Sequence, residues 1–304
     1  MYKKKALARG ISKYWRLYIM LLPALIYFTI FCYLPITGIQ IAFRDFSMKE
    51  GIYGGAWVGL KNFIRFFQSV QFGVLIKNTL SLSLGTLILT FPAPIILALL
   101  LNEAKSPKLK KAVQTLTYAP HFISTVVFVS MIILFLNPSS GIINRIIPLF
   151  GGTSKDFMGN EVWFRPVYII SDIWQNCGWS AIIYAAALAG VDQQLHEAAM
   201  IDGANRLQRI RHIDIPAIVP TMVILFIMNC GNVMSLGYEK VYLMQNSTNI
   251  AASEIISTYV YKVGLMQAQY SYTTAIGLFN SLINLCLLLA VNQIVKKLGN
   301  MSLF

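Results

Sequence analysis

Six runs of apolar residues divide this chain, and each is long enough to cross a lipid bilayer. A helix of about 20 residues spans the roughly 30 Å of hydrocarbon in a bilayer. Backbone polar groups must be satisfied within a segment that crosses lipid, so helices are the expected form. The alternation of apolar and polar residues that is typical of barrel strands is absent from the runs. The sequence therefore predicts an all-α integral membrane protein with six transmembrane helices, at residues 17–36, 75–101, 113–136, 167–189, 215–236 and 275–295.

The composition excludes an ordinary soluble domain. Hydrophobic residues make up 56% of the 304 residues and charged residues only 12%, whereas soluble domains carry about 25% charged residues. A net charge of +13 would indicate nucleic-acid binding in a soluble protein, but in a membrane protein the placement of the charges sets the topology. We therefore expect this chain to contact membrane lipid and not nucleic acid.

The basic residues lie mostly on one side of the expected spans. With an even number of spans, both termini and the loops 102–112 and 190–214 share that side. It carries fifteen Lys and Arg residues against five Asp and Glu residues, whereas the other side carries ten against six. Cytoplasmic loops carry an excess of Lys and Arg, so we expect both termini and both of these loops in the cytoplasm of a bacterial cell, with the spans in its cytoplasmic membrane.

This topology divides the chain into three parts. Residues 1–74 contain a basic N-terminus, the first span and an extracellular loop. Residues 75–295 form a core of five spans that includes the cytoplasmic loop 190–214. Residues 296–304 form a cytoplasmic tail. The first apolar run is longer than the h-region of a signal peptide and no A-x-A cleavage site follows it, so we interpret it as an uncleaved first span.

Several residues predict interruptions of the helices. Pro92, Pro94 and Pro120 lie within spans, where proline removes a backbone hydrogen bond and tends to kink a helix. In the outer loops, Gly and Pro residues mark turns around two short amphipathic segments, at 142–150 and 252–263.

The sequence offers little for catalysis or metal binding. His121 stands alone in the third span, and neither H-E-x-x-H nor G-x-x-x-x-G-K-[ST] occurs. The four cysteines fall inside spans without C-x-x-C spacing, which predicts neither disulfides nor zinc. We therefore expect no catalytic site, no metal, no bound cofactor and no ATPase site on this chain.

The cytoplasmic loop 190–214 has the features of a docking element. From Asp192 to Ile201 the residues favour a helix, with Asp192 able to cap its start. A break at 202–205 and a second, basic helix predict a helix-turn-helix along the membrane surface. Alanines in its first helix permit close approach of another protein, and a glutamate supplies a carboxylate. The alternative is a surface helix whose basic residues face lipid headgroups. The residues that we single out are Glu197, Ala198, Ala199, Gly203, Ile213 and Pro216.

Their spacing, E-A-A, three residues, G, nine residues, I-x-I-P, resembles the signature loop of permeases of type I ABC importers, which depend on binding proteins. The family carries Leu where Ile215 stands. Other segments look like the complex-carbohydrate, or polysaccharide, branch of the maltose-type permeases: Trp57-Val58-Gly59-Leu60-Lys61-Asn62-Phe63, Tyr118-Ala119-Pro120-His121-Phe122-Ile123-Ser124, Trp174 with Gly178-Trp179, and Gly277-Leu278-Phe279-Asn280-Ser281.

This resemblance implies a permease fold of six transmembrane helices and a set of partners. Two cytosolic ABC ATPase subunits would bind ATP and Mg²⁺ and receive the E-A-A loop, the coupling helix, in a cleft. A second permease subunit, usually a different chain in this branch, would complete a heterodimer. An extracellular solute-binding protein would deliver the substrate.

Polar residues inside the spans indicate where a substrate passes, because polar groups in hydrocarbon usually face a cavity or the bundle interior. Amides with aromatic faces suit an uncharged polyhydroxyl ligand such as an oligosaccharide. The alternative is that the amides hydrogen-bond helix to helix. The candidates for the substrate path lie in the outer halves of spans four to six: Asp172, Trp174, Gln175, Asn176, Trp179, Asn229, Asn232, Tyr238, Asn280 and Asn284.

Asp172 differs from these amides because a lone carboxylate in a span normally has a charged partner. Arg165 and Lys262, at the outer rim, are the expected partners. A role in proton relay is the alternative, although no chain of other acidic residues accompanies Asp172.

The leading functional hypothesis is one permease subunit of an ATP-driven importer for oligosaccharides or polysaccharide fragments, which works by alternating access. An ABC importer permease for a non-sugar solute is one alternative. An ion-coupled secondary transporter is another, but this class requires inverted repeats and intramembrane acids, and the chain shows no such repeat and no such acid beyond Asp172.

Overall fold

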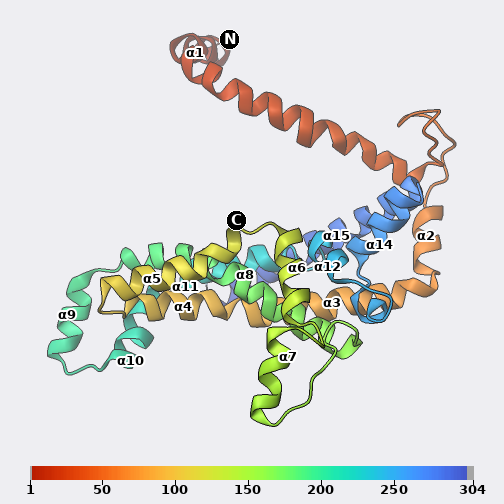
Figure 1. Ribbon diagram of the computed structural model, residues 1–304. Helices are drawn as coiled ribbons and strands as arrows, with labels where there is room; N and C mark the ends of the chain where they lie inside the picture. Colours follow the sequence, from red (N-terminus) through yellow and green to blue (C-terminus); the bar gives the residue numbers. More distant parts are fainter. Residues whose placement is uncertain (1, 300–304) are drawn as a thin grey trace.

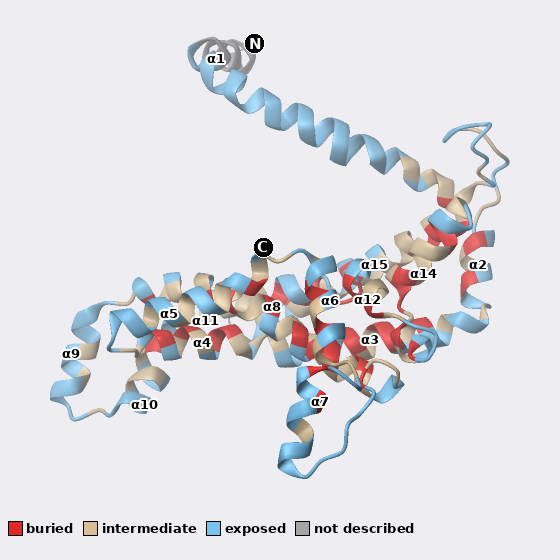
Figure 2. Cartoon of the chain, in the orientation of Figure 1, coloured by how far each residue is buried: buried red, intermediate tan, exposed pale blue. Residues whose placement is uncertain are grey.

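The N-terminal helix stands apart from the rest of the molecule. The computed structural model describes the backbone of residues 2–299 and the side chains of residues 13–297. The first helix, α1 (Tyr2–Phe28), continues through a π-turn, η1 (Thr29–Tyr33), into the 3-10 helix η2 (Leu34–Phe43), which packs on α15. Figures 1 and 2 show α1 extending away from the bundle with an exposed surface. The tail beyond residue 299 and the side chains of Lys3, Lys4, Lys5 and Arg9 lie outside the described residues.

A bundle of helices forms the body of the protein, and α8 lies at its centre. Helix α8 packs against α3, α4, α5 and α11. Gly178 lets α8 approach α5 (Pro107–Tyr118) closely, because a Cβ at Gly178 would lie 2.2 Å from the carbonyl oxygen of Thr117. The bundle helices are α3 (Val70–Thr90), α4 (Pro92–Asn102), α5 (Pro107–Tyr118), α6 (Thr125–Phe135), α8 (Glu161–Ala189), α11 (Ile215–Cys230) and α15 (Tyr270–Gly299).

Four helical stretches in the described part of the chain are long and apolar enough to cross a membrane: Lys13–Phe43, Val70–Asn102, Arg206–Cys230 and Tyr270–Lys297. A fifth candidate consists of Pro107–Phe122 and Thr125–Phe135, which are bent by 107° relative to each other. Helix α8 has the length of a span at 29 residues but is less apolar than these stretches. Charged and amide side chains along it, such as those of Arg165 and Asp172, account for this.

Two of the predicted spans are interrupted, and a third ends earlier than predicted. The second is divided at Phe91, directly before Pro92. The third is not a single straight helix, because Ile123 and Ser124 adopt extended backbone angles after the turn that contains Pro120. The fifth ends at Cys230 and not at Leu236. Gly231 follows it there, and a Cβ at this position would lie 2.5 Å from Leu288 Cδ1 on α15.

Short helices make up the outer segments. The predicted helix at 142–150 is confirmed as α7 (Ile142–Ile146) followed by a 3-10 turn, η4 (Ile147–Phe150). The amphipathic segment at 252–263 is divided near Glu254 into separate short helices. The remaining outer elements are α2 (Lys61–Phe67), α12 (Tyr238–Met244), α13 (Ile250–Ser253), α14 (Ile256–Val260) and the π-turn η6 (Tyr261–Met266).

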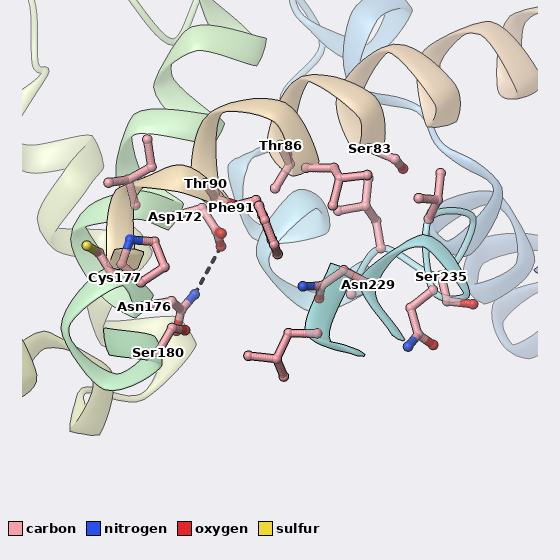
Figure 3. Close-up of a pocket in the computed structure, with 18 of the residues that line it drawn as sticks. Ser83, Thr86, Thr90, Phe91, Asp172, Asn176, Cys177, Ser180, Asn229 and Ser235 are labelled. Atoms are coloured by element: carbon pink, nitrogen blue, oxygen red, sulfur yellow. Dashed lines mark hydrogen bonds between the residues drawn. The ribbon is translucent and has the colours of Figure 1, made fainter. Parts of the chain in front are cut away.

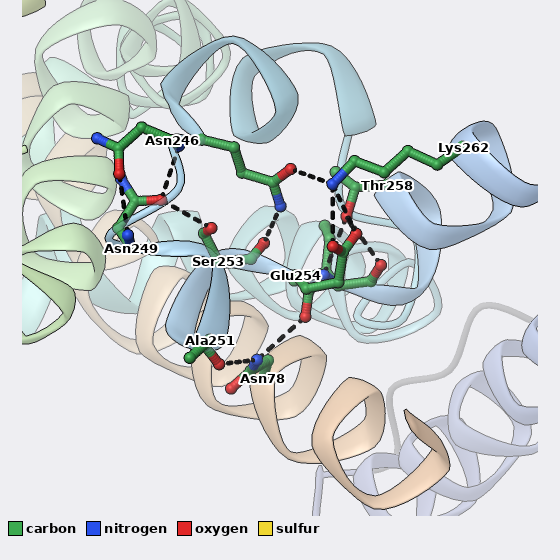
Figure 4. Close-up of polar contacts among 10 residues, drawn as sticks. Asn78, Asn246, Asn249, Ala251, Ser253, Glu254, Thr258 and Lys262 are labelled. Atoms are coloured by element: carbon green, nitrogen blue, oxygen red, sulfur yellow. Dashed lines mark hydrogen bonds and ion pairs between the residues drawn. The ribbon is translucent and has the colours of Figure 1, made fainter. Parts of the chain in front are cut away.

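A polar network holds the segment from α13 to η6 on α3, as Figure 4 shows. Asn78 of α3 donates to the carbonyl oxygens of Ala251, at 2.8 Å, and Glu254, at 3.1 Å. Lys262 Nζ lies 2.9 Å from Glu254 Oε2 and donates to Gln245 Oε1 over 2.9 Å. The carbonyl groups at the break between α13 and α14 are thereby satisfied, which explains why the segment bends here.

Asp172 is paired with a lysine that the sequence did not single out. Lys240 Nζ of α12 lies 3.3 Å from Asp172 Oδ1, and the lysine side chain is only 8% exposed. The aromatic rings of Phe128 and Tyr168 also lie within 5.4 Å and 4.9 Å of this ammonium group. Asp172 thus has its counter-charge and joins α8 to α12.

The two partners expected for Asp172 are engaged elsewhere. Arg165 donates to Asn78 Oδ1 over 3.0 Å, and Lys262 pairs with Glu254. Both are therefore wrong as partners of Asp172. Sequence spacing placed Lys240 in the outer loop but gave no sign that the loop folds back to the level of Asp172.

We predict that Lys240→Met lowers the stability of the protein, because it leaves the Asp172 carboxylate without its counter-charge. Loss of one member of a buried ion pair costs about 3–5 kcal/mol. The apparent melting temperature in detergent should fall clearly. Adding Asp172→Asn to Lys240→Met should recover most of the loss. If the single and the double variant melted at the same temperature, the ion pair would not be the cause.

Candidate functional site

A cavity of about 450 Å³ lies between α3, α8 and α11, and we call it the central cavity. Its volume falls within the range of small-molecule sites in proteins, which is about 300–1,000 Å³. Hydroxyl and amide groups alternate along its wall with apolar and aromatic side chains. Figure 3 shows most of the residues that line it, and its labels mark Ser83, Thr86, Thr90, Phe91, Asp172, Asn176, Cys177, Ser180, Asn229 and Ser235. Tyr184 and Asn232 also line the cavity.

Helix α3 contributes a row of hydroxyl groups that the sequence analysis missed. Ser83, Thr86 and Thr90 are spaced by three and four residues, so they lie on one face of the helix. The hydroxyl oxygens of Ser83 and Thr86 are buried, and no hydrogen-bond partner for them occurs among the described residues. The helical spacing of polar residues in an apolar run was the signal that could have identified them.

Four of the ten residues predicted for the substrate path line the central cavity. Asp172 and Asn176 lie one turn apart on α8, and Asn176 Nδ2 donates to Asp172 Oδ1 over 3.1 Å. Asn229 lies near the end of α11. Asn232 follows that helix, and its side chain donates to the Met228 carbonyl over 3.0 Å. Helix geometry thus brings together side chains from spans four and five, as the sequence predicted.

The other three predicted residues of α8 lie outside the lining of the central cavity. Trp174 packs against Phe128, with ring centroids 5.0 Å apart, and lines a separate apolar cavity. Gln175 is buried within the bundle. Trp179 stacks on the ring of His121, with centroids 4.7 Å apart and an angle of 4° between the planes. These three residues make their contacts away from the central cavity.

The last three predicted residues lie further out. Tyr238 is the first residue of α12 and so falls beyond span five, contrary to the prediction, where it stacks on Tyr261 at 4.9 Å. Tyr238 and Asn280 line a second cavity of about 570 Å³, which shares Ser235 and its two following residues with the central cavity. Asn284 instead joins α15 to the segment after α11: it accepts from the Met234 amide over 2.9 Å and donates to Ser235 Oγ over 2.7 Å.

The predicted helix-turn-helix is present in the loop 190–214. Helix α9 (Gln193–Ile201) is capped by Asp192, whose side chain accepts from the Gln194 amide over 2.9 Å. The helix ends in a Schellman motif. Gly203 has φ +82°, and the amide of Ala204 bonds to the carbonyl of Ala199 over 2.8 Å. Glycine adopts this left-handed conformation without the strain that a side chain adds.

The second half of the loop leads into span five. Asn205 and Gln208 form a capping box at the start of α10 (Arg206–Arg209). A π-turn, η5 (Ile210–Asp214), follows and continues into α11, where Pro216 occupies the first turn, a position that tolerates proline. A small hollow between the two halves is lined by Ala199, Gly203 and Ile213, among others.

Contacts between polar side chains hold the two halves of this loop together and join the loop to the end of α4. His196 Nε2 lies 3.3 Å from Asp214 Oδ1, and the Asp214 side chain is 1% exposed. Arg209 lies 3.9 Å from Glu103, the residue that follows α4. The loop and the end of α4 therefore lie at the same end of the bundle, which Figure 1 also shows. Glu197 and Ala198 are exposed on α9 and remain free to contact another protein.

The chemistry of both regions is that of binding. Among the described residues, no group of three or more His, Cys, Asp or Glu side chains could hold a metal ion. Hydroxyls and amides in the central cavity can exchange hydrogen bonds with a polar solute. The exposed face of the loop 190–214 can dock a partner.

Comparisons with known proteins connect these features. Residues 90–300 match the family described as "Binding-protein-dependent transport system inner membrane component". The chain is 48% identical over 302 residues to the polygalacturonan/rhamnogalacturonan transport system permease protein YteP of Bacillus subtilis, covering 99% of this chain and 94% of that protein. It is 44% identical over 288 residues to protein LplB of the same organism, covering 95% and 91%.

A solved structure agrees with these sequences. The crystal structure of a bacterial ABC transporter involved in the import of the acidic polysaccharide alginate contains a chain that superposes with a TM-score of 0.89 at 40% sequence identity. The match covers 97% of this chain and 99% of the other.

The family expected from the loop motif is thus confirmed. Permease subunits of this kind span the inner, or cytoplasmic, membrane several times and bind no cofactor, and ATP is hydrolysed on partner ATPase subunits. The chain belongs to the family of binding-protein-dependent transport system inner membrane components and is a permease subunit of an ABC importer.

Proposed function

We propose that this permease imports oligosaccharide fragments of polysaccharides and that the sugar passes through the central cavity. The observation that carries the proposal is the wall of that cavity, where hydroxyls of α3 face amides of α8 and α11. Such groups can both donate and accept, as sugar hydroxyls do. The substrates named for the relatives, polygalacturonan/rhamnogalacturonan and alginate, are polysaccharides as well.

The topology that we propose has six spans, with α8 as the fourth and both termini in the cytoplasm. The division into residues 1–74, the core 75–295 and the tail 296–304 follows from it. In support, the excess of basic residues falls on the side of the loop 190–214. In further support, Arg209 lies 3.9 Å from Glu103, so that loop lies beside the turn between α4 and α5, which agrees with two spans between the two loops.

We propose a complex with a second permease subunit that is a different chain, with two cytosolic ATPases and with an extracellular solute-binding protein. A crystal structure of an alginate ABC transporter in complex with an alginate pentasaccharide-bound periplasmic protein supports the last partner. Apart from Ala42, the candidate span Lys13–Phe43 has no buried residue, so a large apolar surface is free to contact lipid or the second permease.

The ATPase would dock on the solvent-exposed face of the loop 190–214. Large apolar side chains are exposed there, which is unusual in a cytoplasmic loop and typical of an interaction site. They are Leu195, Met200, Ile201 and Leu207. Glu197 and Ala198 lie exposed on α9 beside them. The ATPases would draw closer on binding ATP, and the loop would pass this motion into α11 and so to Asn229 in the cavity.

The coupling role predicts the effect of Glu197→Lys. In the complete transporter in proteoliposomes, ATP-driven uptake should fall at least about tenfold, which corresponds to about 1.4 kcal/mol of lost interaction. Less ATPase should also copurify with the permease. Glu161→Lys is the matched control, because Glu161 is also exposed but lies at the end of α8 away from the loop 190–214. Unchanged uptake and unchanged ATPase association would show that the loop is not the coupling site.

The substrate path predicts the effect of Asn229→Ala. The exposed amide of Asn229 borders the cavity. Loss of one hydrogen bond to the sugar costs about 1 kcal/mol, so KM for uptake should rise about fivefold. Ser130→Ala is the control, since the Ser130 hydroxyl bonds to the Val126 carbonyl of its own helix. Equal KM values for both variants would place the path elsewhere.

A further inference from the structure

A chain of hydrogen bonds links the wall of the central cavity to His121, which is not among the residues that line the cavity. His121 Nδ1 lies 3.1 Å from Asn176 Oδ1, and Asn176 Nδ2 lies 3.1 Å from Asp172 Oδ1. Lys240 Nζ lies 3.3 Å from the same carboxylate oxygen. Asp172 and Asn176 border the cavity. His121 and Lys240, at the two ends of this chain, therefore act on the cavity only through Asn176 and Asp172.

The charges at one end of this chain determine the direction of each hydrogen bond in it. An ammonium group only donates and an ionised carboxylate only accepts. Asp172, paired with Lys240, must therefore face the NH₂ group of Asn176. The amide oxygen of Asn176 then points to His121, so His121 Nδ1 must carry the hydrogen and donate it.

The His121 ring is held in the plane that this hydrogen bond needs. It stacks on Trp179 with an angle of 4° between the planes, and Phe122 packs edge-on against the same tryptophan at 5.5 Å. His121 belongs to the turn η3 (Ala119–Phe122), directly before the bend of the third span. Trp179 and Asn176 lie three residues apart on one face of α8. One helix face therefore fixes both the ring and its acceptor.

We infer that His121 is a positioning residue for substrate selection, which holds the Asn176 amide so that an N–H group and the Asp172 carboxylate face the cavity side by side. The inference rests on the proposed sugar path. An amide nitrogen has two hydrogens, so one remains for a ligand after the bond to Asp172. Two neighbouring sugar hydroxyls match this pair, one as acceptor and one as donor. A carboxylate of an acidic sugar would meet the like charge of Asp172 here.

Two substitutions separate the hydrogen bond from the ring stacking. His121→Phe keeps a ring against Trp179 but removes the donor. His121→Gln keeps an N–H donor but removes the ring. The complete transporter, reconstituted with its partner subunits, would be assayed for uptake of labelled trigalacturonate and of its carboxyl-reduced form, trigalactose. KM and the maximal rate would be measured for each.

For a probe that the unaltered transporter takes up, we expect His121→Phe to raise KM about fivefold, the loss typical of one hydrogen bond, with little change in maximal rate. His121→Gln should stay close to the unaltered protein. In an Asn176→Ala background, His121→Phe should have no further effect on KM, because His121 acts through that amide.

The opposite pattern, a raised KM for His121→Gln and none for His121→Phe, would overturn the inference, because stacking and not hydrogen bonding would then be the role of His121. A KM effect of His121→Phe that persists with Asn176→Ala would overturn it as well. If the unaltered transporter took up neither probe, the proposed sugar path itself would fail, and the inference would fall with it.

Discussion

The outer half of the molecule depends on the carboxylate of Asp172. A charged group within a membrane helix is costly unless it is paired, and Lys240 of α12 supplies the counter-charge at 3.3 Å. Helix α12 packs against α6, so this ion pair ties the outer segment to two helices of the bundle. Asn176 and His121 take their orientation from the same carboxylate. The fold of the outer segment and the polarity of the cavity wall therefore have one electrostatic origin.

A second rigid connection joins the loop 190–214 to the cavity. The Schellman motif at Gly203 and the pair between His196 and Asp214 fix α9 against the start of span five. From Arg206 to Cys230 the chain is helical without interruption. Asn229 lies near the far end of this helix and borders the cavity. A displacement of the loop by an ATPase would therefore reach the cavity through a single stiff element.

Local signals in the sequence predicted most of the fold. Apolar runs predicted the long apolar helices, and Asp192 and Gly203 predicted the limits of α9, because caps and turns depend on neighbouring residues. Signals that depend on tertiary folding were missed. The return of α12 toward α8, which selects Lys240 over Arg165 and Lys262, is not encoded in any local pattern. Trp174 and Trp179 share the depth of the cavity residues in the sequence of the span, but depth alone does not tell which residues of a helix face a cavity. The hydroxyl row of α3 shows that helical spacing would have resolved this.

Cys177 lines the central cavity and permits the most direct test of the account. With Cys32, Cys230 and Cys286 replaced by serine and with cysteine-free partners, it is the one thiol of the transporter. A membrane-impermeant maleimide would be added on either side of proteoliposomes, with and without ATP and sugar-loaded binding protein. We predict that ATP changes the side of the membrane from which Cys177 is labelled and that the sugar protects Cys177 from labelling. Labelling that depends on neither ATP nor sugar would contradict alternating access through this cavity.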